Sequence, residues 1–132
     1  MSTGFEVGLS ATLRALHRIP WLPPPEGDLH PHDYRVDVVV ERASLDERGM
    51  VCDLDVLEAA LGNAVAALEG QDLETIRPAE AEAVTVEILA QWFHATLAGS
   101  VQAAGGEMLA VRVWESASAF GGYRAPASTS SE

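Results

Sequence analysis

The 132-residue sequence contains no lysine, and its eight basic residues, all arginines, stand against twenty aspartates and glutamates. The net charge of −12 argues against nucleic acid or an anionic membrane as the main partner, because phosphate surfaces attract basic proteins. No apolar run approaches the roughly 20 residues that span a bilayer. We therefore expect neither a nucleic-acid-binding protein nor a membrane-embedded one.

Cysteine is nearly absent as well. Cys52 stands alone, so the chain can form no internal disulfide, and we interpret Cys52 as a core residue. The first ten residues lack the basic start and apolar run of a signal peptide, which favours a cytoplasmic location. A chain that is 48% hydrophobic and 21% charged is expected to fold. We predict one domain over 1–132, with a core at about 5–124 and a flexible tail at 125–132.

Strand-like segments stand at both ends of the chain. Residues 5–16 are expected to form a first strand, and the proline-rich residues 20–28 a rigid loop. Residues 32–42 alternate between apolar and polar side chains, which is the period of a half-buried strand. Residues 108–116 alternate again, and residues 119–124 return as a fourth strand.

Two helices are predicted between these strand pairs. Asp53 is placed to cap a helix from Leu54 to about Leu68, and Thr85 to cap a second helix that ends at about Ala98. The polar residues 70–84 connect the two. The order ββααββ predicts an α+β fold, a four-stranded antiparallel sheet with two helices on one face. Such a sheet leaves open edges, so we expect a homo-oligomer.

Three of the four histidines fall within residues 17–32. His30 and His32 point to the same side of a strand, because alternate residues share a face. If the first two strands form a hairpin, His17 meets them at the same end and completes a three-nitrogen site for zinc or another divalent metal of the first transition row. The alternative is that His30 and His32 are solvated residues at a strand entrance.

Five short motifs, in order, resemble those of one enzyme family. The chain has LRALHRIP where the family has F-x-A-x-H-x-L-P, HPHDY for HGHxY, and GMVCDL for G-M-V-x-D-F. It has VTVEI for P-T-x-E-N, and VRVWES for V-x-V-x-E-T. Over roughly residues 5–124 the sequence thus resembles the 6-pyruvoyltetrahydropterin and 6-carboxytetrahydropterin synthases.

The resemblance implies a fold, an assembly and a cofactor. It implies the T-fold (tunnelling fold), whose subunits join edge to edge into trimeric barrels that usually stack as hexamers, with active sites at subunit interfaces. It also implies that His17, His30 and His32 bind Zn²⁺ and that the substrate is a small molecule.

A substrate pocket is implied by the same resemblance. Glu115 would anchor a pterin ring, since a carboxylate accepts two parallel hydrogen bonds. Thr85 and Glu87 would lie near that pocket. The alternative for Glu115 is a strand-end surface residue, and for Thr85 and Glu87 a helix cap with a first-turn carboxylate.

The chain departs from the family at its catalytic groups. Glu26 stands at the position of the family's catalytic cysteine, although one branch of the family carries a glutamate near there. Glu69 and Gly70 stand where the family has an Asp-His pair. We expect Glu26 to act as acid or base, with Asp28 a weaker substitute, and Glu69 to be the second catalytic candidate. His94 is expected on a solvated helix face, unless it turns inward to replace the missing imidazole.

Three functions remain open from the sequence. The first is a zinc-dependent enzyme, of lyase or cyclisation type, with altered chemistry on a pterin-like or specialised small molecule. The second is an ordinary enzyme that cleaves the side chain of dihydroneopterin triphosphate. The third is a non-enzymatic zinc-binding oligomer that retains only the fold.

Overall fold

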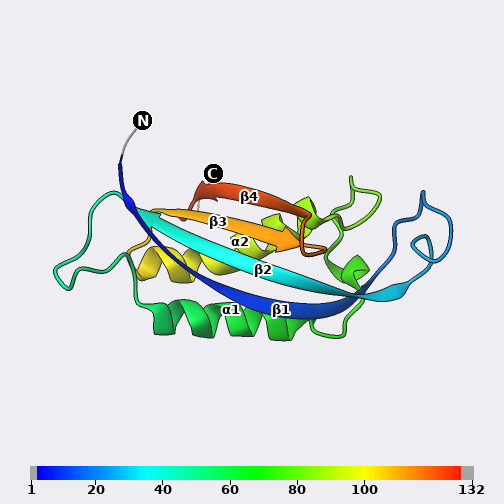
Figure 1. Cartoon of the computed structure of the whole chain (residues 1–132), viewed down its shortest axis with the longest axis horizontal. Coiled ribbons are helices and arrows are strands. Elements are labelled where there is room, and N and C mark those ends of the chain that lie inside the picture. Colours follow the sequence, from blue (N-terminus) through cyan, green and yellow to red (C-terminus); the bar gives the residue numbers. More distant parts are fainter. Residues whose placement is uncertain (1–2, 129–132) are drawn as a thin grey trace.

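A computed structural model describes residues 3–128 and confirms the α+β architecture (Figure 1). The elements follow one another as β1 (Phe5–His17), β2 (His30–Arg42), α1 (Leu54–Leu68), the short 3₁₀ helix η1 (Leu73–Ile76), α2 (Val86–Ala103), β3 (Met108–Trp114) and β4 (Phe120–Pro126). Within residues 3–128, none of the helices combines the length and the apolar character needed to cross a membrane.

All neighbouring strands pair antiparallel in the order β1-β2-β3-β4, and both helices lie on one side of the sheet (Figure 1). The β1-β2 hairpin is longer than its neighbours. Its pairing runs from Phe5 opposite Arg42 to His17 opposite His30. Pairing of β2 with β3 stops at Arg35 and Trp114, so the end of the hairpin extends beyond the rest of the sheet.

The core lies between the sheet and the two helices. Alternate β2 residues face the helices and are fully buried, namely Val36, Val38 and Val40. They belong to one core cluster with Phe93 and Leu97 of α2, which are equally buried. Burying an aliphatic or aromatic side chain of this size contributes about 1.5–3 kcal/mol relative to leaving it exposed, so this layer fixes which face of the hairpin is inside.

Both predicted helix caps are confirmed. The Asp53 side chain accepts a hydrogen bond from the backbone N–H of Asp55 (2.9 Å), and the Thr85 hydroxyl oxygen accepts one from the N–H of Ile88 (3.2 Å). Helix α2 ends at Ala103 rather than at about Ala98. The extra turn keeps Val101 buried against the core, which explains why the helix continues.

The end of the chain differs from the expected tail at 125–132. Strand β4 continues to Pro126, and the N–H of Ala127 donates to the carbonyl oxygen of Glu107 (2.9 Å). Ala127 is fully buried. A flexible tail from residue 125 is therefore wrong for residues 125–127, because they are paired and packed, and residues 129–132 of that expectation lie outside the described residues.

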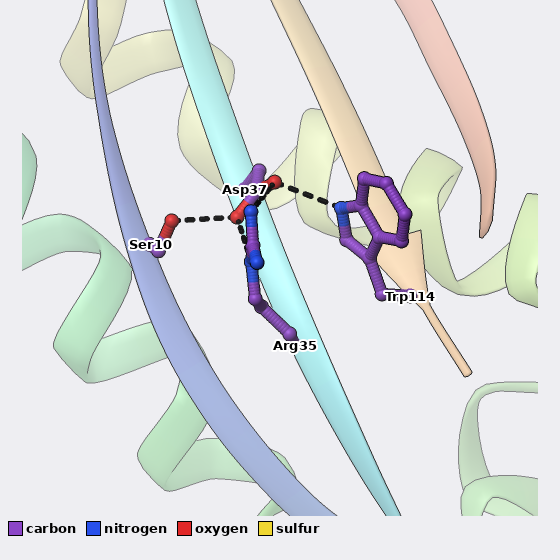
Figure 2. Close-up of polar contacts among 4 residues, drawn as sticks. All are labelled: Ser10, Arg35, Asp37 and Trp114. Atoms are coloured by element: carbon purple, nitrogen blue, oxygen red, sulfur yellow. Dashed lines mark hydrogen bonds and ion pairs between the residues drawn. The ribbon is translucent and has the colours of Figure 1, made fainter. Parts of the chain in front are cut away.

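The sheet face away from the helices carries charged pairs. Three ion pairs lie there, Arg14–Asp33, Arg35–Asp37 and Arg124–Glu41, with N–O distances of 2.8, 2.8 and 3.1 Å. Figure 2 shows that Asp37 also contacts groups on both neighbouring strands. This face is thus held by polar and charged contacts, in contrast to the apolar layer beneath the helices.

Candidate metal centre

The long hairpin brings three histidines together at its outer end, as the strand pairing predicts. His17 lies directly opposite His30, and His32 lies two residues further along the same strand face. The ring centroid of His17 is 4.5 Å from that of His30 and 4.9 Å from that of His32. One ring nitrogen from each residue lies within 4.8 Å of the others, and all three residues are partly buried.

Two of these rings are held by backbone carbonyl groups. Nδ1 of His30 lies 2.7 Å from the carbonyl oxygen of Asp28, and Nε2 of His32 lies 3.1 Å from that of Glu115. A carbonyl oxygen can only accept a hydrogen bond, so each of these nitrogens carries the ring proton. In the neutral form of each ring the lone pair then lies on the other nitrogen, Nε2 of His30 and Nδ1 of His32.

His17 has a side-chain partner instead. Its Nδ1 lies 3.0 Å from the hydroxyl oxygen of Tyr34. Burial, followed by the charges of His32 and His30, lowers the pKa of His17 to about 4. The ring is therefore neutral at neutral pH, which is the form that binds a metal. Tyr34 is not among the predicted site residues, although it follows His32 at the spacing that shares a strand face.

The cluster fits a divalent metal of the first transition row. Three imidazoles that leave further positions open are the donor set of catalytic zinc sites. Metal-binding histidines also tend to give their second ring nitrogen to an oxygen acceptor, and here an oxygen lies at the second nitrogen of all three rings. Both the ring nitrogens and their surroundings are thus compatible with Zn²⁺.

Glu115 lies beside this cluster, just after β3 ends. Its carbonyl oxygen accepts a hydrogen bond from Nε2 of His32. The pKa of Tyr34 is raised, mainly by burial and secondly by the negative charge of the exposed Glu115 carboxylate. The structure thus brings the backbone of Glu115 into contact with one of the three histidines, His32.

The first turn of α2 covers the same end of the sheet. A Cβ atom added to Gly121 would lie 3.2 Å from Cδ of Glu87, and Gly121 pairs with Val113. Glu87 is exposed, whereas the Thr85 hydroxyl is used in capping the helix. The capping alternative for Thr85 is therefore confirmed, and a substrate contact from Thr85 or Glu87 stays a prediction.

The two candidate catalytic carboxylates lie on different segments. Glu26 is exposed in the loop between β1 and β2, four residues before His30, and its carbonyl oxygen accepts from the N–H of Ile19 (2.9 Å). The Glu69 carboxylate accepts from the backbone N–H of Arg14 (3.2 Å) at the outer edge of β1. Glu69 is thus occupied in holding the end of α1 to the sheet.

His94 is buried, so the expectation of a solvated position is wrong. The residue is 8% exposed, its Nε2 donates to the carbonyl oxygen of Ala125 (3.1 Å), and its ring packs edge-on against Tyr123. Through strand pairing Ala125 lies level with Val40, eight residues from His32 on β2. At about 3.3 Å per residue this is about 26 Å, so His94 does not replace the missing imidazole within this chain.

Cys52 is 4% exposed and belongs to the core, as expected. The thiol therefore lies away from the histidines, in the segment that leads into α1. The described chain thus offers imidazoles and carboxylates at the candidate centre, and no thiol from Cys52.

A four-stranded antiparallel sheet backed by two helices, with three histidines at the end of its long hairpin, defines a T-fold protein with a candidate metal centre. The family model described as 6-pyruvoyl tetrahydropterin synthase matches residues 6–126. The chain therefore belongs to the 6-pyruvoyl tetrahydropterin synthase family. No match is found among the curated proteins.

Solved structures share this fold at low sequence identity. A 6-pyruvoyl tetrahydropterin synthase from Plasmodium vivax is 12% identical with a TM-score of 0.72, covering 95% of this chain and 99% of that one. The Caenorhabditis elegans enzyme is 15% identical with a TM-score of 0.67, covering 94% and 97%. An uncharacterised protein from Wolinella succinogenes is 16% identical with a TM-score of 0.70, covering 92% and 98%.

Two further Plasmodium vivax structures are of variants described as catalytic residue mutants. In one a glutamate is replaced by cysteine, and in the other the same glutamate is replaced by alanine. Their TM-scores are 0.71 and 0.73, at 11% and 12% identity. A glutamate is thus the catalytic residue named for that enzyme.

Proposed function

We propose that this chain is a zinc-dependent enzyme, of lyase or cyclisation type, that acts on a pterin or a pterin-like small molecule with chemistry altered from that of the cysteine-dependent family members. The observation that carries the proposal is the gathering of ring nitrogens from His17, His30 and His32 within 4.8 Å, beside Glu115. Membership of the family supports the pterin-synthase-like activity.

The metal would be held by the three histidines, and when bound it supplies Lewis-acid polarisation of substrate oxygens. The protein's own residues bind and orient the substrate. The Glu115 carboxylate accepts two parallel N–H groups from the edge of a heterocycle. Glu87 and Thr85, at the start of α2, line the same end of the sheet and limit how the ring can lie.

Glu26 moves the proton. A carboxylate in the loop that joins the two histidine-bearing strands can accept a C–H or O–H proton and return it to the product, once substrate binding has removed water from the loop. The catalytic glutamate named for the Plasmodium vivax enzyme supports this role. Glu69 is the second candidate for this catalytic role. Its carboxylate already accepts a hydrogen bond from the backbone N–H of Arg14, which holds the edge of β1, so Glu26 is the preferred residue.

Cleavage of the dihydroneopterin triphosphate side chain is the second candidate function. It is favoured by Glu26, since a glutamate is the catalytic residue named for the Plasmodium vivax 6-pyruvoyltetrahydropterin synthase. The net charge of −12 counts against it, because a triphosphate must be held by cationic groups.

We also propose that the protein is a homo-oligomer. It would be built from trimers, two of which assemble as a hexamer, with active sites between subunits. Strands β1 and β4 form the two edges of the sheet, and edges invite pairing with another chain. Trp21, Leu22 and Leu29, in the loop beside the histidines, are exposed. Sedimentation as a 14.0 kDa monomer at micromolar concentration would contradict this assembly.

A cytoplasmic location belongs to the same proposal and is tested by cell fractionation.

Metal content decides first among the functions. The purified protein is expected to hold about one zinc per subunit by mass spectrometry, and the His30→Ala/His32→Ala double variant is expected to hold none. Absence of metal from both proteins contradicts zinc dependence.

Turnover is then measured with the zinc-loaded protein, beginning with dihydroneopterin triphosphate and related pterins. The Glu26→Gln variant is expected to lose activity, and Glu47→Gln, a matched change in an exposed loop, to retain it. If the protein binds zinc but consumes no pterin, it is either a non-enzymatic zinc-binding oligomer or an enzyme whose substrate is not a pterin. Cleavage of dihydroneopterin triphosphate supports the second candidate function.

A further inference from the structure

The three histidines differ in the kind of oxygen that holds them. For His30 and His32 it is a backbone carbonyl, at 2.7 and 3.1 Å. For His17 it is the phenol hydroxyl of Tyr34, at 3.0 Å from Nδ1. A carbonyl only accepts a hydrogen bond, whereas a hydroxyl can either accept or donate. His17 is therefore the ring whose proton position depends on a side chain.

We propose that Tyr34 is a positioning residue of the metal centre: its hydroxyl oxygen accepts the Nδ1 proton of His17 and so directs the lone pair of His17 Nε2 to the ion. The inference rests on the proposed function, since it assumes that the three histidines bind a metal. It adds a group that fixes the ligand without touching the ion.

Proton accounting supports this assignment. A neutral imidazole carries one ring proton, and the nitrogen that binds a metal must have its lone pair free. In the metal-free protein the Tyr34 O–H can donate to Nδ1, which places the His17 proton on Nε2. A metal bound at Nε2 would require that proton on Nδ1, and the Tyr34 O–H would then rotate so that its oxygen accepts. The ring stays neutral, and this exchange releases no proton to solvent.

The position of Tyr34 is fixed by packing. The residue is 4% exposed, and its ring centroid lies 4.6 Å from that of His32 and 5.8 Å from that of His17. It is separated from His32 by one residue on the same strand, so both side chains lie on one face. A hydroxyl held in this way can orient the His17 ring before any metal arrives, which is the action expected of an outer-shell partner.

The test is the zinc affinity of the full-length protein, measured by competition with a chromophoric chelator. Tyr34→Phe removes the hydroxyl and keeps the ring that packs on His32, and zinc affinity is expected to fall by roughly 10–100-fold. Tyr123→Phe is the matched control, because Tyr123 also packs edge-on against a histidine ring, that of His94, at 5.1 Å. The control is expected to bind zinc like the parent.

Nuclear magnetic resonance of ¹⁵N-labelled histidines tests the same inference without a substitution. In the zinc-loaded parent, Nδ1 of His17 is expected to carry the proton and Nε2 to show the shift of a metal-bound nitrogen. A proton on Nε2, or zinc binding by Tyr34→Phe that equals or exceeds that of the parent, overturns the inference. If the parent protein binds no zinc, both the proposed function and this inference are wrong. If the parent binds zinc and Tyr34→Phe binds it with equal affinity, only the inference is wrong.

Discussion

Asp37 on β2 accepts a hydrogen bond from the indole N–H of Trp114 on β3, at 2.8 Å (Figure 2). The same carboxylate accepts from the hydroxyl of Ser10 on β1 at 2.6 Å, and from two nitrogens of Arg35 at 2.8 and 2.9 Å. One side chain thus links three neighbouring strands on the helix-free face of the sheet. The linkage lies where β3 ends and the histidine-bearing part of the hairpin continues alone.

Loss of this carboxylate is expected to destabilise the fold. Asp37→Ala leaves the Trp114 and Ser10 donors without their acceptor, and hydrogen bonds to charged groups contribute about 1.5–3 kcal/mol each, with part recovered by water. We expect the free energy of unfolding in urea to fall by about 2 kcal/mol. Asp33→Ala is the control, because its pair with Arg14 is largely exposed and contributes less than about 1 kcal/mol. Equal losses in the two variants contradict the prediction.

The stability contributed by Asp37 is expected to depend on pH. Its hydrogen bonds from Arg35, and those from Ser10 and Trp114, outweigh burial and lower the pKa of Asp37 from 3.8 to about 2. Since the folded pKa lies below the unfolded one, the contribution is complete above about pH 4 and is lost as the pH falls toward 2. A shift of this size corresponds to about 2 kcal/mol before screening by water, which reduces the contribution because the Arg35 partner is exposed.

The pH dependence is measured by urea unfolding of the parent and of Asp37→Asn between pH 6 and 2.5. The stability difference between them is expected to be constant down to about pH 4 and to shrink below it. A difference that stays constant throughout this range shows that Asp37 titrates normally in the folded protein.

Substitution of Thr85 tests its role as the N-cap of α2. Thr85→Ala removes the oxygen that accepts from Ile88, and loss of an N-cap typically costs about 1 kcal/mol. Thr85→Ser keeps that oxygen and is expected to retain most of the unfolding free energy. Thermal unfolding of the two variants checks this, and equal destabilisation by serine and alanine is the contrary result.

Gly121 is expected to tolerate no side chain. A Cβ atom there would lie 2.7 Å from Cγ2 of Val86, so Gly121→Ala pushes the start of α2 away from β4. We expect a loss of about 1–3 kcal/mol, as for other overpacked sites. Gly62→Ala is the opposite case, because Gly62 lies in α1 with no atom within 4 Å of the added Cβ, and alanine there is expected to gain about 0.5–1 kcal/mol. Urea unfolding of both variants gives the comparison.

The sheet and the gathering of the histidines could be predicted from local patterns. Alternation at Val36, Val38 and Val40 indicates the inner face of β2, because side-chain direction reverses at each strand residue. A hairpin across the proline-rich loop then places His17 against His30 without knowledge of any distant contact. Asp53 and Thr85 could likewise be identified as caps, since capping depends on the next few residues alone.

Features that depend on distant packing could not be predicted in this way. Helix α2 carries apolar residues on several sides, so its sequence does not determine that His94 faces β4. The segment after α1 looked like a polar connection, yet Leu73 is buried and the N–H of Leu16 donates to the carbonyl oxygen of Gln71. The partners of Tyr34 and Asp37 lie on other strands, and only the assembled register brings them within reach.

The net charge of the protein is distributed unevenly between the helix-free face of the sheet and the rest of the molecule. Strand alternation assigns four arginines and four carboxylates to that face, which are Arg14, Arg35, Arg112, Arg124, Glu6, Asp33, Asp37 and Glu41. They cancel, so the net charge of −12 lies off this face, on the helices, the loops, the chain ends and Arg42, which alternation assigns to the helix side of β2. Two molecules of this net charge repel each other at low ionic strength, and the repulsion is weaker when they approach over the balanced sheet face than when they approach over the negatively charged remainder. The fold therefore gives the protein a preferred direction of encounter, which added salt would weaken.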